Sequence, residues 1–282
     1  MKKLKIIRTI KEMVAWSNQN KSQNKIGFVP TMGYLHEGHL SLVRTAKENS
    51  DLVVVSIFVN PTQFGANEDL STYPRDFERD ISLLENLEVD VVFFPNNQEM
   101  YPTGYKTWVV TDEITSILCG KSRPTHFKGV TTIVSKLINI VNPESMFMGT
   151  KDFQQLTVLK QMVQDLNFRT KIIGCPIVRE NDGLAMSSRN KYLNEIERKN
   201  ALCLSESIKS AQKMIKNGEK SPNKIIESVK KIITKKSGKI DYVEILDERT
   251  LKFTDSIDEH SRLFLAVYIG KTRLIDNANL NV

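Results

Sequence analysis

Scarce residue types set the first limits on this sequence of 282 residues, which has three cysteines, two tryptophans and four histidines. Cys119, Cys175 and Cys203 form no close pair and match no metal-ligand spacing. We therefore expect buried, reduced thiols in a cytoplasmic protein, and neither a disulfide framework nor a metal held by cysteines.

Long apolar runs are also missing, and none approaches the roughly 18 residues that a membrane span requires. The basic first residues, MKKLKIIRTIKEMVAW, contain neither an uninterrupted apolar core nor a small-residue cleavage site. They predict a strand followed by an amphipathic helix, and not a secretory signal or a membrane segment.

Positive charge is present but unevenly distributed. The net charge is +7, and residues 204–240 alone contain ten lysines and three glutamates, which accounts for the whole excess. In NKIIESVKKIITKK (residues 223–236) isoleucines recur on one helical face and lysines cover the other. Because aromatic residues and arginines are not interleaved, we expect a solvated helix face that attracts anions at most weakly. We expect no nucleic-acid partner.

Strand-like and helix-like runs alternate over the first two-thirds of the chain. The run DLVVVSIFVN (residues 51–60) is almost continuously apolar and β-branched, which is typical of a strand buried on both faces of a parallel sheet. The alternation predicts an α/β fold, a Rossmann-like doubly wound parallel sheet, with ligands at the carboxyl ends of its strands. We expect strands in 25–31, 51–60, 89–95, 144–150 and 169–178, and helices in 39–50, 73–87, 125–141 and 152–167.

The pattern changes near residue 177. A polar loop (residues 179–193) is followed by lysine-rich helices and then by strand-like runs at 239–247 and 262–277. We therefore predict two domains, residues 1–177 with the parallel sheet and residues 178–282 as a second, smaller α+β domain.

The segment PTMGYLHEGH (residues 30–39) places two histidines where a strand gives way to a helix. Unpaired backbone N–H groups at such a junction favour an anion. His36 and His39 are three residues apart and can face the same side of a helical turn, where their N–H groups can donate to phosphate. Taken alone, the segment also fits a capping or exposed histidine pair, or a metal pair without an obvious third ligand.

Two further strand ends carry amides or a lysine. Asn60 and Gln63 follow the strand at 51–60, although an Asn-Pro turn is usually only a turn. Lys151 follows the strand at 144–150 and opens a helix, where a cation is disfavoured unless an anion is bound. Asp152 beside it could simply cap that helix.

The loop DGLAMSSRN (residues 182–190) contains two hydroxyls and an arginine in succession, Ser187, Ser188 and Arg189. A serine-rich loop is often only a linker. An arginine in a mobile loop nevertheless suits the binding of charge that develops on phosphorus.

With these segments together, the chain closely resembles the pantothenate synthetase (pantoate–β-alanine ligase) family over nearly its whole length. The matching motifs are PTMGxLHxGH at 30–39, SIFVNPxQFG at 56–65, YPRD at 73–76, RPTHFxGVxTIVxKL at 123–137, KDFQQ at 151–155, DGLAMSSRNxYL at 182–193 and GKTRLIDN at 270–277. The HxGH and MSSR segments also resemble the two signatures of the wider nucleotidyl-transferring superfamily.

The resemblance implies a reaction in two steps. The pantoate carboxylate attacks the α-phosphorus of MgATP to give pantoyl adenylate and pyrophosphate, and the amine of β-alanine then displaces AMP to give pantothenate. It also implies a cytoplasmic homodimer that works on small molecules, with the MSSR loop and the second domain acting as a lid.

The resemblance further implies the site residues. His39 is the expected proton donor, and His36, Lys151, Ser187, Ser188 and Arg189 complete the catalytic set. Gln63, Gln155 and Asn60 are expected at pantoate, and Asp80 is the expected protein contact of magnesium. The other residues expected at ATP are Met32, Gly33, Tyr34, Leu35, Glu37, Gly38, Gly149, Thr150, Asp152, Val178 and Met186.

Two positions depart from the pattern, because many family members have glutamate where this chain has Thr150 and Cys119. The first change can shift nucleotide affinity, and the second puts in doubt a carboxylate role there. The alternatives are another nucleotidyltransferase of the superfamily, which would lack the paired glutamines Gln63 and Gln155, and a catalytically silent nucleotide sensor or nucleic-acid-binding protein. The intact Lys151 and MSSR segment argue against a silent protein.

Overall fold

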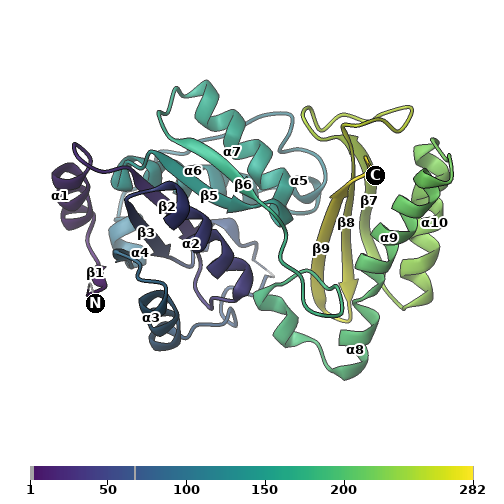
Figure 1. Cartoon of the computed structure of the whole chain (residues 1–282), viewed down its shortest axis with the longest axis horizontal. Helices are drawn as coiled ribbons and strands as arrows, with labels where there is room; N and C mark the ends of the chain where they lie inside the picture. The colour runs from purple at the N-terminus through teal and green to yellow at the C-terminus, as the bar shows by residue number, and fades with distance from the viewer. Residues whose placement is uncertain (1–2, 67, 282) are drawn as a thin grey trace. The chain divides into compact units, whose positions relative to one another are not determined.

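The chain forms two compact units in a computed structural model that describes residues 3–66 and 68–281 (Figure 1). Within the described residues, the first unit contains Met1–Ser116, Arg123–Thr150 and Gln155–Pro176. The second unit contains Ile177–Val282 together with two short segments, Ile117–Ser122 and Lys151–Gln154. A single division of the chain at residue 177 therefore does not describe the two units fully.

A six-stranded parallel sheet with the strand order β1-β4-β3-β2-β5-β6 forms the centre of the first unit. The expected doubly wound sheet is confirmed. The order along the chain reverses between β2 and β5, and ligands of such sheets bind at this switch point, beyond the carboxyl ends of the strands. The strands are β1 (Lys5–Ile7), β2 (Ile26–Thr31), β3 (Leu52–Ile57), β4 (Val91–Phe93), β5 (Ser145–Gly149) and β6 (Lys171–Cys175).

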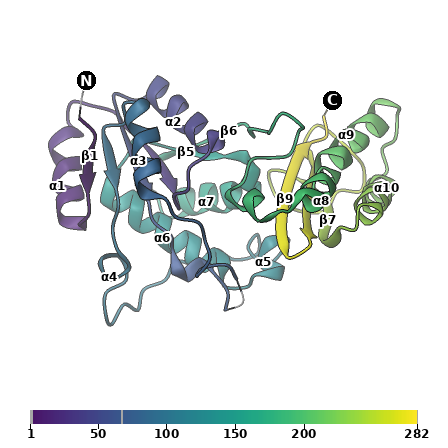
Figure 2. The same cartoon turned by 90° about the horizontal axis from the view of Figure 1, so that it is seen from below.

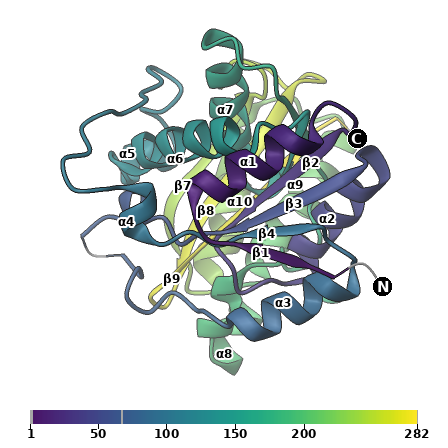
Figure 3. The ribbon, with the colours of Figure 1, turned by 90° about the vertical axis from the view of Figure 1, so that its left-hand side faces the viewer.

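Helices cover both faces of this sheet (Figure 3). Successive side chains of a strand point to opposite faces, so that Phe28 packs towards one helix layer and Val29 towards the other. The first layer contains α1 (Ile10–Asn20), α6 (His126–Val141) and α7 (Phe153–Asp165), and the second contains α2 (Glu37–Asn49) and α3 (Phe77–Asn86).

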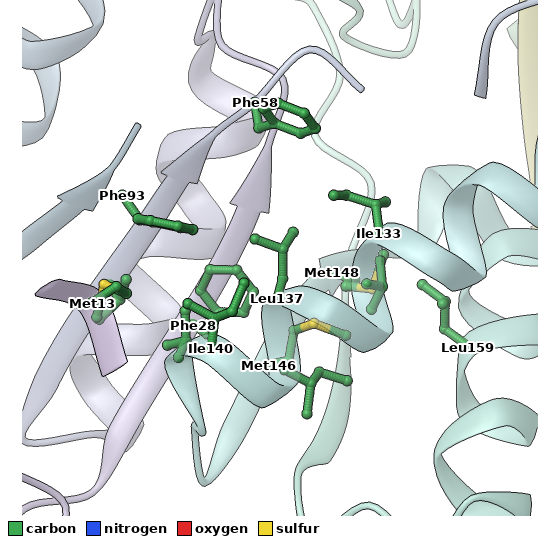
Figure 4. Close-up of a cluster of buried hydrophobic side chains, with 14 of the residues drawn as sticks. Met13, Phe28, Phe58, Phe93, Ile133, Leu137, Ile140, Met146, Met148 and Leu159 are labelled. Atoms are coloured by element: carbon green, nitrogen blue, oxygen red, sulfur yellow. The ribbon is translucent and has the colours of Figure 1, made fainter. Parts of the chain in front are cut away.

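The core under α6 is made of aromatic and long aliphatic side chains (Figure 4). Phe28 and Phe93 from the strands meet Leu137 and Ile140 from α6, and Met146 fills the space beside them. Burying each such side chain contributes about 1.5–3 kcal/mol. This core fixes the strand ends from which the loops described below start.

In the second unit, the antiparallel sheet β7-β8-β9 packs against two helices (Figure 2). The strands are β7 (Lys239–Asp247), β8 (Ser261–Ile269) and β9 (Thr272–Asn279), and the helices are α9 (Cys203–Lys216) and α10 (Pro222–Lys235). Ile225, Val229 and Ile233 of α10 are fully buried, whereas its lysines lie on the other side, as the sequence pattern predicted.

The main elements expected from the sequence are confirmed, with ends that differ by a few residues. The sequence analysis did not predict the short helices α4 (Asn97–Met100), α5 (Cys119–Ser122) and α8 (Glu195–Asn200), or the 3-10 helices η1 (Pro61–Gln63), η2 (Thr150–Asp152) and η3 (Ser188–Tyr192). Within residues 3–66 and 68–281, no helix has the length and apolar composition of a membrane span.

Candidate active site

The loop after β2 turns sharply before α2 begins. The hydroxyl of Thr31 donates to the carbonyl of Ser56 at 2.8 Å and accepts the N–H of Gly33 at 3.1 Å. Gly33 has a φ of +82° and Tyr34 a φ of +50°, in the left-handed region that favours glycine. This turn carries His36 to the position immediately before the first residue of α2.

Asp80 of α3 holds this loop from the opposite side. Its two carboxylate oxygens accept the backbone N–H groups of Tyr34 and Leu35, each at 2.7 Å. The Asp80 side chain is only 1% exposed, and Arg79 donates to the carbonyl of Leu35 at 2.9 Å. Burial raises the pKa of Asp80, although the two backbone hydrogen bonds oppose that shift.

His39 is oriented by a hydrogen bond to the backbone. Its Nδ1 accepts the N–H of His36 at 3.3 Å, so that this nitrogen carries no proton and the neutral ring carries its proton on Nε2. The two imidazole rings lie with their centroids 4.1 Å apart. In this tautomer, Nε2 of His39 is a hydrogen-bond donor.

The remaining residues of the segment have simpler surroundings. Glu37, in the first turn of α2, forms an ion pair with Arg44, and that hydrogen bond lowers the pKa of Glu37. Gly38 lies in the same turn. Met32 accepts a hydrogen bond on its sulfur from Nε2 of Gln63 at 2.9 Å.

Asn60 is buried, and its amide is fully engaged by the protein. Its nitrogen donates to the side-chain oxygen of Gln63 at 3.2 Å and to the carbonyl of Gly129 at 3.1 Å. Its oxygen accepts the hydroxyls of Thr62 at 3.0 Å and Tyr101 at 2.9 Å. These contacts make Asn60 a residue that orients Gln63.

Three residues of the RPTHFKG segment hold the Gln63 turn, a role that the sequence analysis did not assign. Arg123 donates to the carbonyl of Gln63 at 3.1 Å and pairs with Glu68, and His126 contacts the same carbonyl at 2.9 Å. A side chain on Gly129 would lie 2.7 Å from the backbone nitrogen of Gln63. The long motif was the only signal in the sequence, because these contacts join positions about 60 residues apart.

The end of β5 completes the candidate site in the first unit. Gly149 ends the strand, and a side chain there would meet no atom within 4 Å, so that its backbone is open on that side. Thr150 follows in η2, and Gln155 is half-buried in the first turn of α7. Because β2 and β5 are parallel neighbours, the loop containing His36 and the end of β5 lie at the same edge of the sheet.

Lys151 and Asp152 belong to the second unit. Lys151 lies in η2, immediately before α7, and its carbonyl accepts a hydrogen bond from Asn277 at 2.8 Å. Asp152 is exposed. The sequence analysis placed both residues at the start of the helix itself, which differs by one short 3-10 turn.

The loop that contains the MSSR segment is a tight hairpin. Met186 donates its N–H to the carbonyl of Val178 at 3.0 Å, and the hydroxyl of Ser187 accepts the N–H of Arg189 at 3.3 Å. Ser188 is buried and opens η3, and Arg189 is half-buried. These residues are therefore held by an ordered local structure.

A cavity of about 770 Å³ lies in the first unit, within the range of small-molecule sites. Its walls include Met32, Gly33 and Tyr34 from the loop after β2, together with Asp80 from α3. Phe94, after β4, and Phe64, after η1, supply apolar surface.

The residues that the structure describes offer no resident site for magnesium. No group of three or more histidine, cysteine, aspartate or glutamate side chains that could hold a metal ion occurs among them. Asp80, the expected contact, is buried and already accepts two backbone N–H groups. These surroundings do not fit a direct protein ligand of magnesium.

Comparison with known proteins gives a consistent result. Residues 5–279 match the family model described as pantoate-beta-alanine ligase. A pantothenate synthetase from a Sulfurihydrogenibium species is 57% identical over 91% of this chain and 92% of the relative. A pantothenate synthetase from Fervidobacterium nodosum is 54% identical, over 99% of this chain and 100% of the relative.

Solved structures agree with the sequence comparisons. The pantoate–β-alanine ligase of Thermus thermophilus superposes with a TM-score of 0.93 at 39% identity, covering 98% of this chain and 99% of that chain. The enzyme from Francisella tularensis, complexed with βγ-ATP and β-alanine, has a TM-score of 0.86 at 40% identity, with 99% of each chain covered. The family expected from the sequence motifs is thereby confirmed. The chain belongs to the pantoate–β-alanine ligase family, the pantothenate synthetases.

Proposed function

We propose that this chain joins pantoate to β-alanine through a pantoyl adenylate, at the expense of ATP. The pantoate carboxylate attacks the α-phosphorus and releases pyrophosphate. The amine of β-alanine then attacks the acyl carbon, and AMP leaves with the bridging oxygen. The observation that carries this proposal is the hydrogen bond that leaves Nε2 of His39 as a donor, on the loop beside the switch point of the sheet.

His39 donates to the triphosphate in this mechanism, and His36 assists it. Lys151, Ser187, Ser188 and Arg189 offset the charge that grows on phosphorus, which lowers the barrier because that charge is largest in the transition state. The other ATP-binding residues of the proposal are Met32, Gly33, Tyr34, Leu35, Glu37, Gly38, Gly149, Thr150, Asp152, Val178 and Met186.

Gln63 and Gln155 bind pantoate. A neutral amide orients the carboxylate without removing the negative charge that makes it a nucleophile. Asn60 acts through Gln63, because its own donors and its acceptor are engaged by protein groups.

Magnesium enters bound to the nucleotide in this proposal, because the described residues present no set of ligands for it. We also propose that the enzyme is a homodimer of the cytoplasm, as the family resemblance implies, and that its second unit with the MSSR loop excludes water from the adenylate.

Pyrophosphate exchange tests the proposal. The purified chain is incubated with ATP and labelled pyrophosphate, with and without pantoate, and in the absence of β-alanine. Exchange that requires pantoate, followed by release of AMP and pantothenate when β-alanine is added, supports the proposal. Exchange with other acceptors only would indicate another nucleotidyltransferase, and nucleotide binding without exchange would indicate a silent sensor.

A further inference from the structure

Two adjacent polar residues of the last strand, β9, are buried in the second unit. Asp276 and Asn277 are each 2% exposed. They are bonded to each other, because the Asp276 carboxylate accepts the N–H of Asn277 at 2.8 Å. Burying such groups costs free energy unless they are hydrogen-bonded, so that their partners explain their presence.

Asn277 holds the segment that contains Lys151. Its side-chain nitrogen donates to the Lys151 carbonyl at 2.8 Å, and its side-chain oxygen accepts from Arg262 at 2.7 Å. The Arg262 guanidinium also lies 3.9 Å above the ring of Phe153, which packs edge-on against Phe264. The backbone around Lys151 is therefore fixed at a carbonyl and at an aromatic ring two residues later.

Asp276 holds the hairpin that leads to the MSSR segment. It forms a two-pronged ion pair with Arg179, at 2.7 and 2.9 Å, which is the strong geometry for these groups. Arg179 also donates to the carbonyl of Gly183 at 3.1 Å and lies opposite Ala185 in an antiparallel bridge. The pair thus ties both arms of the hairpin to β9.

We propose that Asp276 and Asn277 are positioning residues for the adenylation step. One dipeptide fixes two phosphate-binding elements, the Lys151 segment through Asn277 and the MSSR hairpin through Asp276. The two elements consequently keep a constant separation whenever the second unit moves. This inference rests on the proposed roles of Lys151 and Arg189, and it gives the terminal GKTRLIDN motif a physical function.

Double-mutant cycles test the Asn277 arm. Asn277→Asp keeps an oxygen for Arg262 but removes the donor to the Lys151 carbonyl, and Asn277→Ala removes both. We expect each to lower kcat roughly 10- to 100-fold, the cost of misplacing a catalytic group, with the pantoate KM unchanged. In a Lys151→Ala background, the same Asn277 changes should alter kcat by less than about 2-fold, because the effects are not additive when one residue acts through another.

The Asp276 arm is tested in the same way, with Asp276→Asn measured alone and in an Arg189→Ala background. Asn279→Ala is the matched control, because Asn279 lies on the same strand but bonds to Glu248 and to the Glu259 carbonyl. It should leave kcat unchanged. Thermal unfolding of every variant identifies those that fail to fold, and the Asn277→Asp variant, which retains the Arg262 contact, then decides the matter.

The outcomes separate the inference from the proposed function. Additive losses of Asn277 and Lys151, or of Asp276 and Arg189, would overturn the positioning role while leaving the function intact. Lys151→Ala and Arg189→Ala variants that retain full activity would instead overturn the proposed roles of those side chains.

Discussion

At the scale of single residues, one hydrogen bond decides what His39 can do. The N–H of His36 occupies Nδ1 of His39, and the remaining function of the ring is then that of an Nε2 donor. A donor that is fixed before the substrate arrives needs no reorganisation during the reaction.

The first prediction concerns this donor. His39→Ala should lower the rate of pantoate-dependent pyrophosphate exchange by about 10²- to 10³-fold, or roughly 3–4 kcal/mol of barrier, as for other preorganised donors to a developing oxyanion. His260→Ala, which changes a histidine of the second unit beside Glu259, is the control and should exchange at the normal rate. A loss of less than tenfold in His39→Ala would be inconsistent with the assigned role.

The second prediction concerns Asp80. Asp80→Asn keeps the shape but turns an NH₂ group towards one of the two loop N–H groups, which should cost about 1–3 kcal/mol of stability. The maximal rate should fall, because the loop before His36 loses an anchor, while the magnesium concentration for half-maximal rate should not change. Glu78→Gln, an exposed change on the same helix, is the control. A clear increase in the magnesium requirement of Asp80→Asn would assign the carboxylate to the metal.

Sequence alone was sufficient to select residues such as His39 and Lys151, because unusual residue types at strand ends conflict with a purely structural role. It could not separate direct binding from positioning. Asp80 and Asn60 were selected as a metal contact and a substrate contact, yet their hydrogen bonds to protein groups are visible only once α3 and α6 are packed.

At the scale of elements, the Gln63 turn depends on how closely α6 approaches η1. Gly129 allows that approach, because a side chain there would overlap the Thr62 carbonyl and lie 2.7 Å from the Gln63 nitrogen. Arg123 and Glu68 then fasten the turn.

The third prediction follows from this approach. Gly129→Ala should push the turn away and cost about 1–3 kcal/mol of stability, the usual penalty of overpacking, and it should raise the KM for pantoate. Asn139→Ala, at an exposed position of the same helix, should change neither quantity. Urea unfolding and steady-state kinetics measure both, and a Gly129→Ala enzyme with normal stability and KM would refute the account of the turn.

The fourth prediction uses the pH dependence of the Glu68–Arg123 pair. Burial raises the pKa of Glu68, but the hydrogen bond and charge of Arg123 outweigh it and leave the pKa below its ordinary value of 4.5. The pair therefore stabilises the fold above pH 4.5, and this contribution is lost as pH falls through the lowered pKa of the folded state.

Glu68→Gln should accordingly destabilise the protein by about 1 kcal/mol at pH 7, and the difference from the unchanged protein should shrink below pH 4.5. Chemical denaturation between pH 3 and 7 measures this difference. A difference that stays constant over the range would show that the ion pair does not stabilise the turn.

The main helices and strands were predictable because their patterns are local. Buried strands such as β3 have continuous β-branched sequences, and α10 has a clear apolar face. The short helix α5 has no such pattern. It is held by Gln154, whose side chain accepts the N–H of Cys119 at 3.0 Å and donates to the carbonyl of Ile117 at 2.8 Å, over more than 30 residues of sequence.

At the scale of the whole molecule, each of the two units has its own apolar core. His36, His39 and Gln63 belong to the first unit, and Lys151 and the MSSR segment belong to the second. The sequence predicted the change near residue 177 from composition. It could not predict that residues 117–122 and 151–154 belong with the later part, because tertiary contacts alone decide that.

Transfer of oxygen from pantoate to AMP tests the central claim most directly. Pantoate labelled with ¹⁸O in its carboxylate is converted with ATP and β-alanine, and the products are analysed by mass spectrometry. Attack on the α-phosphorus predicts one ¹⁸O atom in each AMP formed. Label in orthophosphate, with ADP as the other product, would instead show activation at the γ-phosphorus and would contradict the adenylate mechanism.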